Sequence, residues 1–114
     1  MPIPDYQTVM LPLLKLTVDR KEHRVGDLVE KLAVEFRLTD DERKELLPSG
    51  QTFVFGSRVG WARTYLKKAG LLDSQKRATV TITERGLSVL NRNPPKIDVR
   101  LLREFPEFLE FQNT

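Results

Sequence analysis

The chain has no cysteine, one histidine and one tryptophan among its 114 residues. Without cysteine it forms no disulfide and offers no thiolate as a nucleophile or metal ligand. The single histidine, His23, sits in a polar stretch without a carboxylate set at metal-ligand spacing. We therefore expect no catalytic residue, no metal and no cofactor, and we interpret His23 as an ordinary surface residue.

Long apolar runs are also missing. No stretch approaches the roughly 20 apolar residues that cross a bilayer, and the amino terminus lacks the basic region and small-residue cleavage site of a secretory signal. With 39% hydrophobic and 31% charged residues, the composition is that of an ordinary globular domain. We expect a cytoplasmic location, no membrane partner, a domain over residues 1–93, and a helical extension or linker over residues 94–114.

The formal net charge is only +3, but its distribution is uneven. Residues 55–77 carry six Lys and Arg side chains and one carboxylate, whereas residues 98–114 carry two cationic and four anionic side chains. A phosphate backbone favours such a concentration of cations. Charge alone fits equally well with solvated faces that have no partner.

Residues 55–69 predict an amphipathic helix. At 100° per residue its apolar stripe consists of Phe55, Val59, Ala62, Leu66 and Ala69. The opposite side consists of Ser57, Gly60, Trp61, Thr64, Lys67 and Lys68. A cationic, hydroxyl-bearing outer face of this kind suits a nucleic-acid groove.

Apolar spacings predict two earlier helices, one within residues 5–19 that continues through Pro12 with a kink, and one over residues 25–36. The polar connection at residues 21–24 has room for a short edge strand. Thr39 is expected to cap a short third helix, which Pro48 and the residues after it end.

Residues after the amphipathic helix predict a small hairpin, with strands at 71–72 and 79–82. Thr83 is expected to cap a helix that ends before Pro94. The apolar segment over residues 99–111 is expected to dock, either on this core or on another chain. This order predicts a mainly α winged helix-turn-helix with a small β-hairpin and extra carboxyl-terminal helices.

Several runs resemble the amino-terminal domain of Mrr restriction-system proteins, and the likeness extends to about residue 111. The runs are Pro4-Asp-Tyr-Gln7, Met10-Leu-Pro-Leu-Leu14, Leu46-Leu-Pro-Ser-Gly-Gln51, Arg58-Val-Gly-Trp-Ala-Arg-Thr-Tyr-Leu-Lys-Lys-Ala-Gly70 and Ile82-Thr-Glu-Arg-Gly86. The resemblance implies a winged-helix DNA-binding module ahead of a nuclease domain with a divalent-metal carboxylate site. It also implies a part in type IV restriction, directed at DNA with modified, typically methylated bases.

The chain departs from that family pattern at two places. Gly56-Ser57 stands where members tend to have Asp-Asn, so a base contact carried by asparagine is lost. Gln75 and Ala78 stand where members tend to have proline and glycine around the corner of the wing, so the resemblance does not fix the turn type or the reach of the wing.

Eight residues are our candidates for DNA contact. They are Ser57, Arg58, Arg63, Thr64, Lys67 and Lys68 on the helix, and Lys76 and Arg77 at the tip of the wing. Arginine can pair with guanine in a bidentate manner, whereas lysine more often contacts phosphate. We expect Trp61 to cover a neighbouring helix rather than nucleic acid. Gly60, which costs roughly 1 kcal/mol in a helix relative to alanine, suggests close approach of another backbone, of either protein or DNA.

Pro4-Asp5 and Glu42-Arg43-Lys44 superficially match the carboxylate and lysine set of metal-dependent nucleases. Both fall at expected helix starts, where such residues are common as caps, so we interpret the match as chance. The leading hypothesis is a double-stranded DNA-binding module, with a nuclease domain possible in a longer chain. The alternative is a protein-interaction module that forms a homodimer or docks on a partner domain through Trp61 and the apolar segment 99–111.

Overall fold

The computed structural model describes residues 3–113. Met1, Pro2 and Thr114, at the outer ends of the two expected segments, lie outside the described residues. The first helix, α1, spans Tyr6–Leu16 and begins at Asp5, whose carboxylate accepts a 2.7 Å hydrogen bond from the backbone N–H of Thr8. The helix continues through Pro12 as predicted, but it ends at Leu16, before Asp19.

The next elements follow the predicted order. β1 spans His23–Arg24, α2 spans Val25–Glu35 and α3 spans Asp40–Lys44. Thr39 caps α3 as predicted, because its hydroxyl accepts from the N–H of Glu42 at 3.1 Å while the Glu42 carboxylate accepts from the N–H of Thr39 at 2.8 Å. This reciprocal pair is a capping box.

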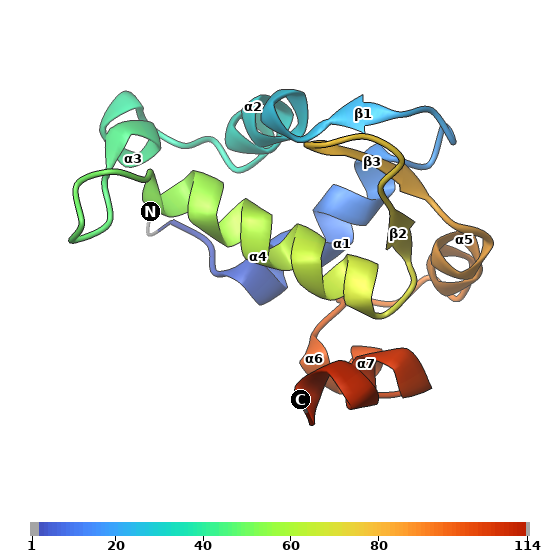
Figure 1. Cartoon of the computed structure of the whole chain (residues 1–114). Coiled ribbons are helices and arrows are strands. Elements are labelled where there is room, and N and C mark those ends of the chain that lie inside the picture. Colours follow the sequence, from blue (N-terminus) through green and yellow to red (C-terminus); the bar gives the residue numbers. More distant parts are fainter. Residues whose placement is uncertain (1–2, 114) are drawn as a thin grey trace.

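The fourth helix, α4, spans Val54–Lys68 and lies at the centre of the fold (Figure 1). All five residues of its predicted apolar stripe are buried, and α1 packs along it. Gly70 ends the helix with a φ of 81°, a left-handed conformation that favours glycine. There the N–H of Leu71 donates back to the carbonyl of Leu66 at 2.9 Å, and the chain turns sharply into the hairpin.

The hairpin consists of β2, Leu72–Asp73, and β3, Thr79–Ile82. Our prediction placed the first strand one residue too early, because Leu71 is taken up by the helix-ending turn. β3 is the central strand of a three-stranded antiparallel sheet with the order β1-β3-β2. Leu72 pairs with Ile82, and His23 pairs with Val80. The predicted edge strand is therefore confirmed.

The fifth helix, α5, spans Glu84–Asn91, and Thr83 caps it as predicted by accepting from the N–H of Gly86 at 3.0 Å. Gly86 lets α5 lie directly against the turn after α4. A Cβ at this position would lie 2.4 Å from the carbonyl oxygen of Leu71, so only glycine fits.

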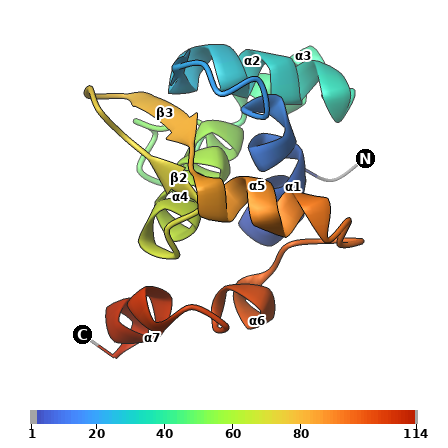
Figure 2. The ribbon, with the colours of Figure 1, turned by 90° about the vertical axis from the view of Figure 1, so that its right-hand side faces the viewer.

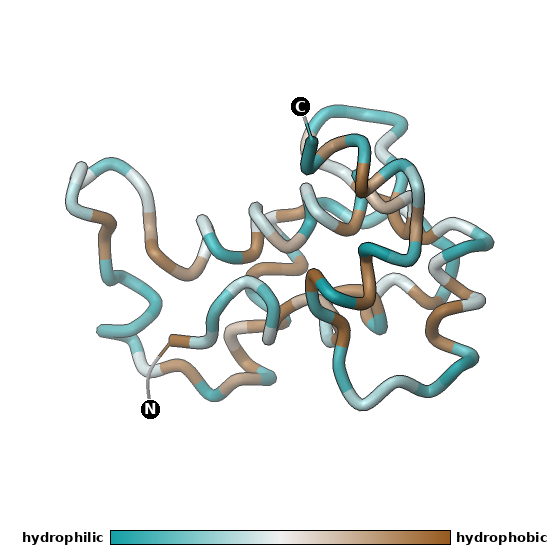
Figure 3. Tube along the Cα trace, turned by 90° about the horizontal axis from the view of Figure 1, so that it is seen from below, coloured by the Kyte–Doolittle hydropathy of each residue, from teal (hydrophilic) through white to brown (hydrophobic). Residues whose placement is uncertain are grey.

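The carboxyl-terminal segment forms α6, Val99–Leu102, and α7, Pro106–Gln112. Figure 2 shows the two short helices as a layer below the rest of the molecule, and Figure 3 shows apolar residues recurring along this segment. Ile97, Leu102 and Phe108 are buried and belong to the same core as α4. The segment therefore docks on its own chain, and the fold is a winged helix-turn-helix extended by this layer.

Candidate nucleic-acid interface

The outer face of α4, opposite its buried stripe, combines exposed cations with small polar residues. Lys67 and Lys68 are exposed, whereas Ser57, Gly60, Arg63 and Thr64 are half-buried. Among residues 3–113, no hydrogen bond or ion pair engages the side chains of Ser57, Arg63, Thr64 or Lys67. The fold therefore leaves the donors of these side chains available to a ligand.

Gly60 lies in the middle of this face and has no structural task in the fold. A Cβ built at Gly60 meets nothing within 4 Å, so neither a neighbouring helix nor the hairpin requires glycine there. The two alternatives for the approaching backbone were protein and DNA. Within the described chain, no protein backbone comes close to this position.

Arg58 is committed to a different contact. Its guanidinium donates to the backbone carbonyls of Ile3 at 2.7 Å and Pro4 at 3.2 Å. The side chain is half-buried and ties the segment before α1 to the flank of α4. The structure thus separates Arg58 from Arg63 and Lys67, which lie on the other flank of α4 and whose side chains make no hydrogen bond or ion pair within residues 3–113.

Trp61 does not cover a neighbouring helix, so our expectation for this residue needs correction. Its side chain is 54% exposed, and its ring contact is with Tyr65 of the same helix, with centroids 6.1 Å apart. The neighbouring flank of α4 is already occupied, because Tyr65 packs against Tyr6, Phe108 and Phe111. Trp61 consequently remains at the edge of the outer face.

The carboxyl end of α4 borders the acidic layer. A shallow cleft of about 750 Å³, here called the α4–α7 cleft, is lined by Lys67, Lys68, Gly70, Glu107, Glu110 and Phe111. The ammonium of Lys68 lies 5.4 Å from the centroid of the Phe111 ring, a cation–π geometry. Both lysines nevertheless remain exposed, so α7 with Glu107 and Glu110 lies beside them but does not bury them.

The tip of the wing carries the two remaining candidates. Lys76 is exposed and lies 4.0 Å from Glu22, a weak surface pair, and Arg77 is exposed. The turn is closed by its own polar groups, since the carbonyl of Lys76 accepts from the hydroxyls of Ser74 and Thr79. Ala78 adopts a left-handed φ of 61°, a conformation that favours glycine. The turn at the tip of the wing is therefore closed by Ser74, Thr79 and a left-handed alanine.

Arg85 is a residue that the sequence did not single out. Its guanidinium donates to the carbonyl of Ala69, the last residue before Gly70, at 2.8 Å, and to Glu107 at 2.7 Å. It also stacks over the ring of Phe105, 4.8 Å from the centroid. The cation complements the negative end of the α4 dipole and joins that end to α7. An arginine after a helix cap has no local pattern that reveals such partners.

The residues of the apparent nuclease motif are used as caps, as we interpreted them. Asp5 begins α1 and Glu42 completes the capping box of α3. The backbone N–H of Thr8 lowers the pKa of Asp5, and that of Thr39 lowers the pKa of Glu42. Among residues 3–113, no group of three or more His, Cys, Asp or Glu side chains is arranged to hold a metal ion. The single histidine, His23, forms a hydrogen bond of 2.8 Å between its Nε2 and the carboxylate of Asp19.

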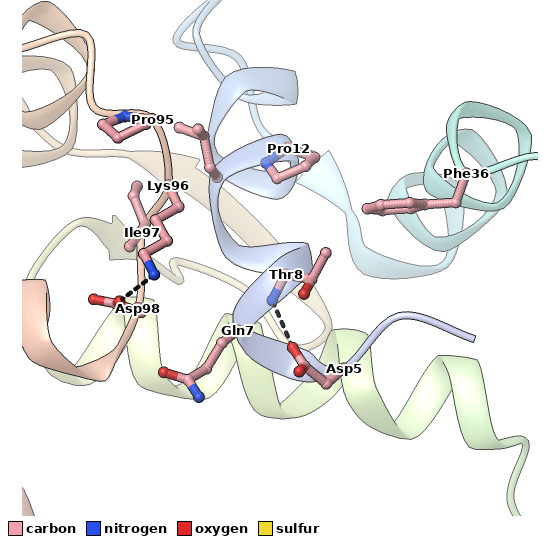
Figure 4. Close-up of a pocket in the computed structure, with 10 residues that line it drawn as sticks. Asp5, Gln7, Thr8, Pro12, Phe36, Pro95, Lys96, Ile97 and Asp98 are labelled. Carbon is pink, nitrogen blue, oxygen red and sulfur yellow. Dashed lines mark hydrogen bonds and ion pairs between the residues drawn. The ribbon is translucent and has the colours of Figure 1, made fainter. Parts of the chain in front are cut away.

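A second cavity, of about 440 Å³, lies beside α1 (Figure 4). It is bounded by the start of α1, by Phe36 after α2 and by residues 95–98. Its cation, Lys96, pairs with Asp98 at 3.6 Å. No residue of α4 lines this cavity, so it is separate from the outer face.

Comparison with known proteins places these features in a family. The family model described as the Mrr N-terminal domain matches residues 6–92. The type IV methyl-directed restriction enzyme EcoKMrr of Escherichia coli (strain K12) is 32% identical over 95 residues, which cover 82% of this chain and 31% of that enzyme. The chain thus spans about a third of the relative's length. No solved structure matches the chain. None of the helices in residues 3–113 has the length and apolar character of a membrane span.

Proposed function

The chain belongs to the family of Mrr N-terminal domains, and on that premise we propose that it is a double-stranded DNA-binding module of a type IV restriction system. In this proposal it brings DNA with modified, methylated bases to a nuclease domain of a longer chain. The relative that is named methyl-directed is about three times as long as the matched part, which leaves room for a nuclease domain in such proteins.

The observation that carries the proposal is the cationic outer face of α4, on which the side chains of Ser57, Arg63, Thr64 and Lys67 make no hydrogen bond or ion pair within residues 3–113. A solvated helix face without a partner tends to mix both signs of charge and to avoid glycine. This face has three cations, two hydroxyls and Gly60, and within α4 there is no carboxylate. In the proposed complex α4 enters the major groove, where Arg63 and Thr64 reach base edges and Lys67 contacts phosphate. Lys68, Lys76 and Arg77 contact flanking phosphates, and Ser57 reaches a phosphate near the start of α4.

A salt titration of duplex binding tests the proposal. The affinity should fall as salt rises, because each phosphate contact releases condensed counterions. Lys67→Ala should weaken binding and reduce the slope of log K against log salt by about 1. The matched control is Lys15→Ala, because Lys15 is exposed in the last turn of α1 and not on the outer face. Binding that is absent at low salt, or insensitive to salt, contradicts the proposal.

The part of the proposal that concerns methylation needs a separate comparison. Duplexes of one sequence, unmethylated or methylated at cytosine or adenine, should be bound with different affinities at the same salt concentration. Equal affinities would assign the recognition of methyl groups to another part of a longer chain while leaving DNA binding by this module intact.

Protein interaction is the second candidate, and the exposed Trp61 and Phe53 are the observations that favour it. The apolar segment 99–111 no longer needs a partner chain, because its buried residues pack on α4. Sedimentation of the intact chain with and without duplex separates the possibilities. A dimer that forms without DNA and dissociates in Trp61→Ala supports an interaction module, whereas a monomer throughout excludes a homodimer.

A further inference from the structure

Lys68 contacts α7 and also belongs to the proposed DNA-binding surface of α4. It belongs to the outer face of α4, and its ammonium lies over the ring of Phe111 on α7. An ammonium that is held over an aromatic face by cation–π attraction is less available to a phosphate. The same side chain therefore links the docking of α7 to the binding surface proposed above.

The docked helix also brings carboxylates to the cations. Glu107 and Glu110 line the α4–α7 cleft together with Lys67 and Lys68. A phosphate that approaches these lysines also approaches two carboxylates, and like charges repel one another even in water. The acidic helix thus lowers the attraction of this end of α4 for a polyanion.

Polar and aromatic contacts hold α7 in this position, and Phe108 is fully buried in the core. Arg85 bonds Glu107 at 2.7 Å and the carbonyl that ends α4 at 2.8 Å. Phe108 and Phe111 pack against Tyr65, with centroids 5.6 Å and 5.7 Å apart. The Arg85–Glu107 pair is partly exposed, and pairs of this kind are weak. The contact of Phe111 is also at the edge, since its side chain is only half-buried.

From these contacts we infer that α7 is an intramolecular competitor for the carboxyl end of α4, so that its docking and the binding of DNA weaken each other. The inference rests on the proposed function, because the competing ligand is the duplex of that proposal. The coupling is reciprocal by thermodynamic necessity. DNA should loosen α7, and changes that loosen or neutralise α7 should strengthen DNA binding.

Two variants of the full chain test the inference by duplex affinity at low salt. Glu107→Gln combined with Glu110→Gln removes the repulsion and should raise the affinity about fivefold. Phe111→Leu keeps an apolar contact with Tyr65 but removes the ring from Lys68, and should raise both the affinity and the salt slope. The control is Glu35→Gln combined with Glu45→Gln, which makes the same change in net charge at exposed positions outside the cleft.

Hydrogen exchange provides a readout that a general charge effect does not move. The amides of α7 should exchange faster in the duplex complex than in the free chain. Slower exchange, or gains in affinity that are no larger than those of the control, overturns the inference and leaves the proposed function standing. If neither the wild-type chain nor the neutralised variants bind duplex at low salt, the proposed function fails and the inference fails with it. Binding that appears only in the neutralised variants supports both.

Discussion

Gly60→Ala is the substitution for which stability and binding should change in opposite directions. Gly60 lies inside α4, and a Cβ at this position meets nothing within 4 Å. Alanine is the better helix former by about 0.8–1 kcal/mol, and it also restricts the unfolded chain. Because no contact is lost and none is strained, the full difference should appear as stability.

The expected gain is therefore about 0.5–1 kcal/mol in the free energy of unfolding, or a rise of about 3–5 °C in Tm for a chain of this size. Duplex binding should weaken, because the added methyl group stands where the groove is proposed to approach the helix most closely. A loss of about tenfold, or about 1.4 kcal/mol, is what a displaced docking geometry would cost.

The assay combines urea unfolding of the free chain with duplex titration at fixed salt. Ser88→Ala is the matched control, because Ser88 is exposed on α5 and the change also improves helix propensity, by about 0.5 kcal/mol. This control should gain stability and keep its affinity. A loss of stability in Gly60→Ala would show that a Cβ at this position meets a neighbouring group, contrary to the structure. Unchanged affinity would show that this glycine is not reserved for a ligand.

Three further outcomes follow from single contacts. Gly86→Ala should lower the free energy of unfolding by about 2–4 kcal/mol, since its Cβ would lie 2.4 Å from the carbonyl oxygen of Leu71; wild-type stability in urea would contradict this. Arg58→Ala should lower the free energy of unfolding by about 1–2 kcal/mol, because the guanidinium donates to two backbone carbonyls. The salt slope of duplex binding should stay unchanged. A slope lowered by about 1 would instead show that Arg58 contacts a phosphate. Asp5→Ala should cost about 1 kcal/mol at pH 7. The N–H of Thr8 lowers the pKa of Asp5 below 3.8, so this cap stabilises the fold above that pH and its contribution is lost as the pH falls further. The difference between wild type and variant should therefore shrink at pH 2–3, and a constant difference would refute the assignment.

Local patterns were sufficient to predict most of the elements. The buried stripe of α4 follows from spacing, and the caps at Thr39 and Thr83 follow from hydroxyls placed before acidic first turns. Such signals act over three or four residues, so the chain displays them directly. The prediction for the first strand of the hairpin was one residue too early, because the N–H of Leu71 bonds back to the end of α4. Apolar periodicity does not show where such a turn ends and a strand begins.

Roles that depend on distant partners were beyond the sequence. Trp61 was expected to cover a neighbouring helix, but Phe108 and Phe111 occupy the neighbouring flank of α4, and Trp61 is left 54% exposed. Arg85 gave no signal, since its partners lie 16 and 22 residues away. The assignment of the candidate DNA contacts stays a prediction. Lys67→Ala and Arg58→Ala test it at two of the eight positions, with different expected effects on the salt slope.

The sequence by itself determined a winged helix-turn-helix whose amphipathic helix presents cations on the side opposite its apolar stripe, because periodicity and capping are properties of neighbouring residues. Tertiary structure alone decided which of those cations remain free. Arg58 is held by backbone carbonyls 54 and 55 residues away, and Lys68 is shared with the ring of Phe111, whereas the side chains of Arg63 and Lys67 make no hydrogen bond or ion pair within residues 3–113. Both outcomes depend on which surfaces pack together, and packing joins residues that no local pattern relates.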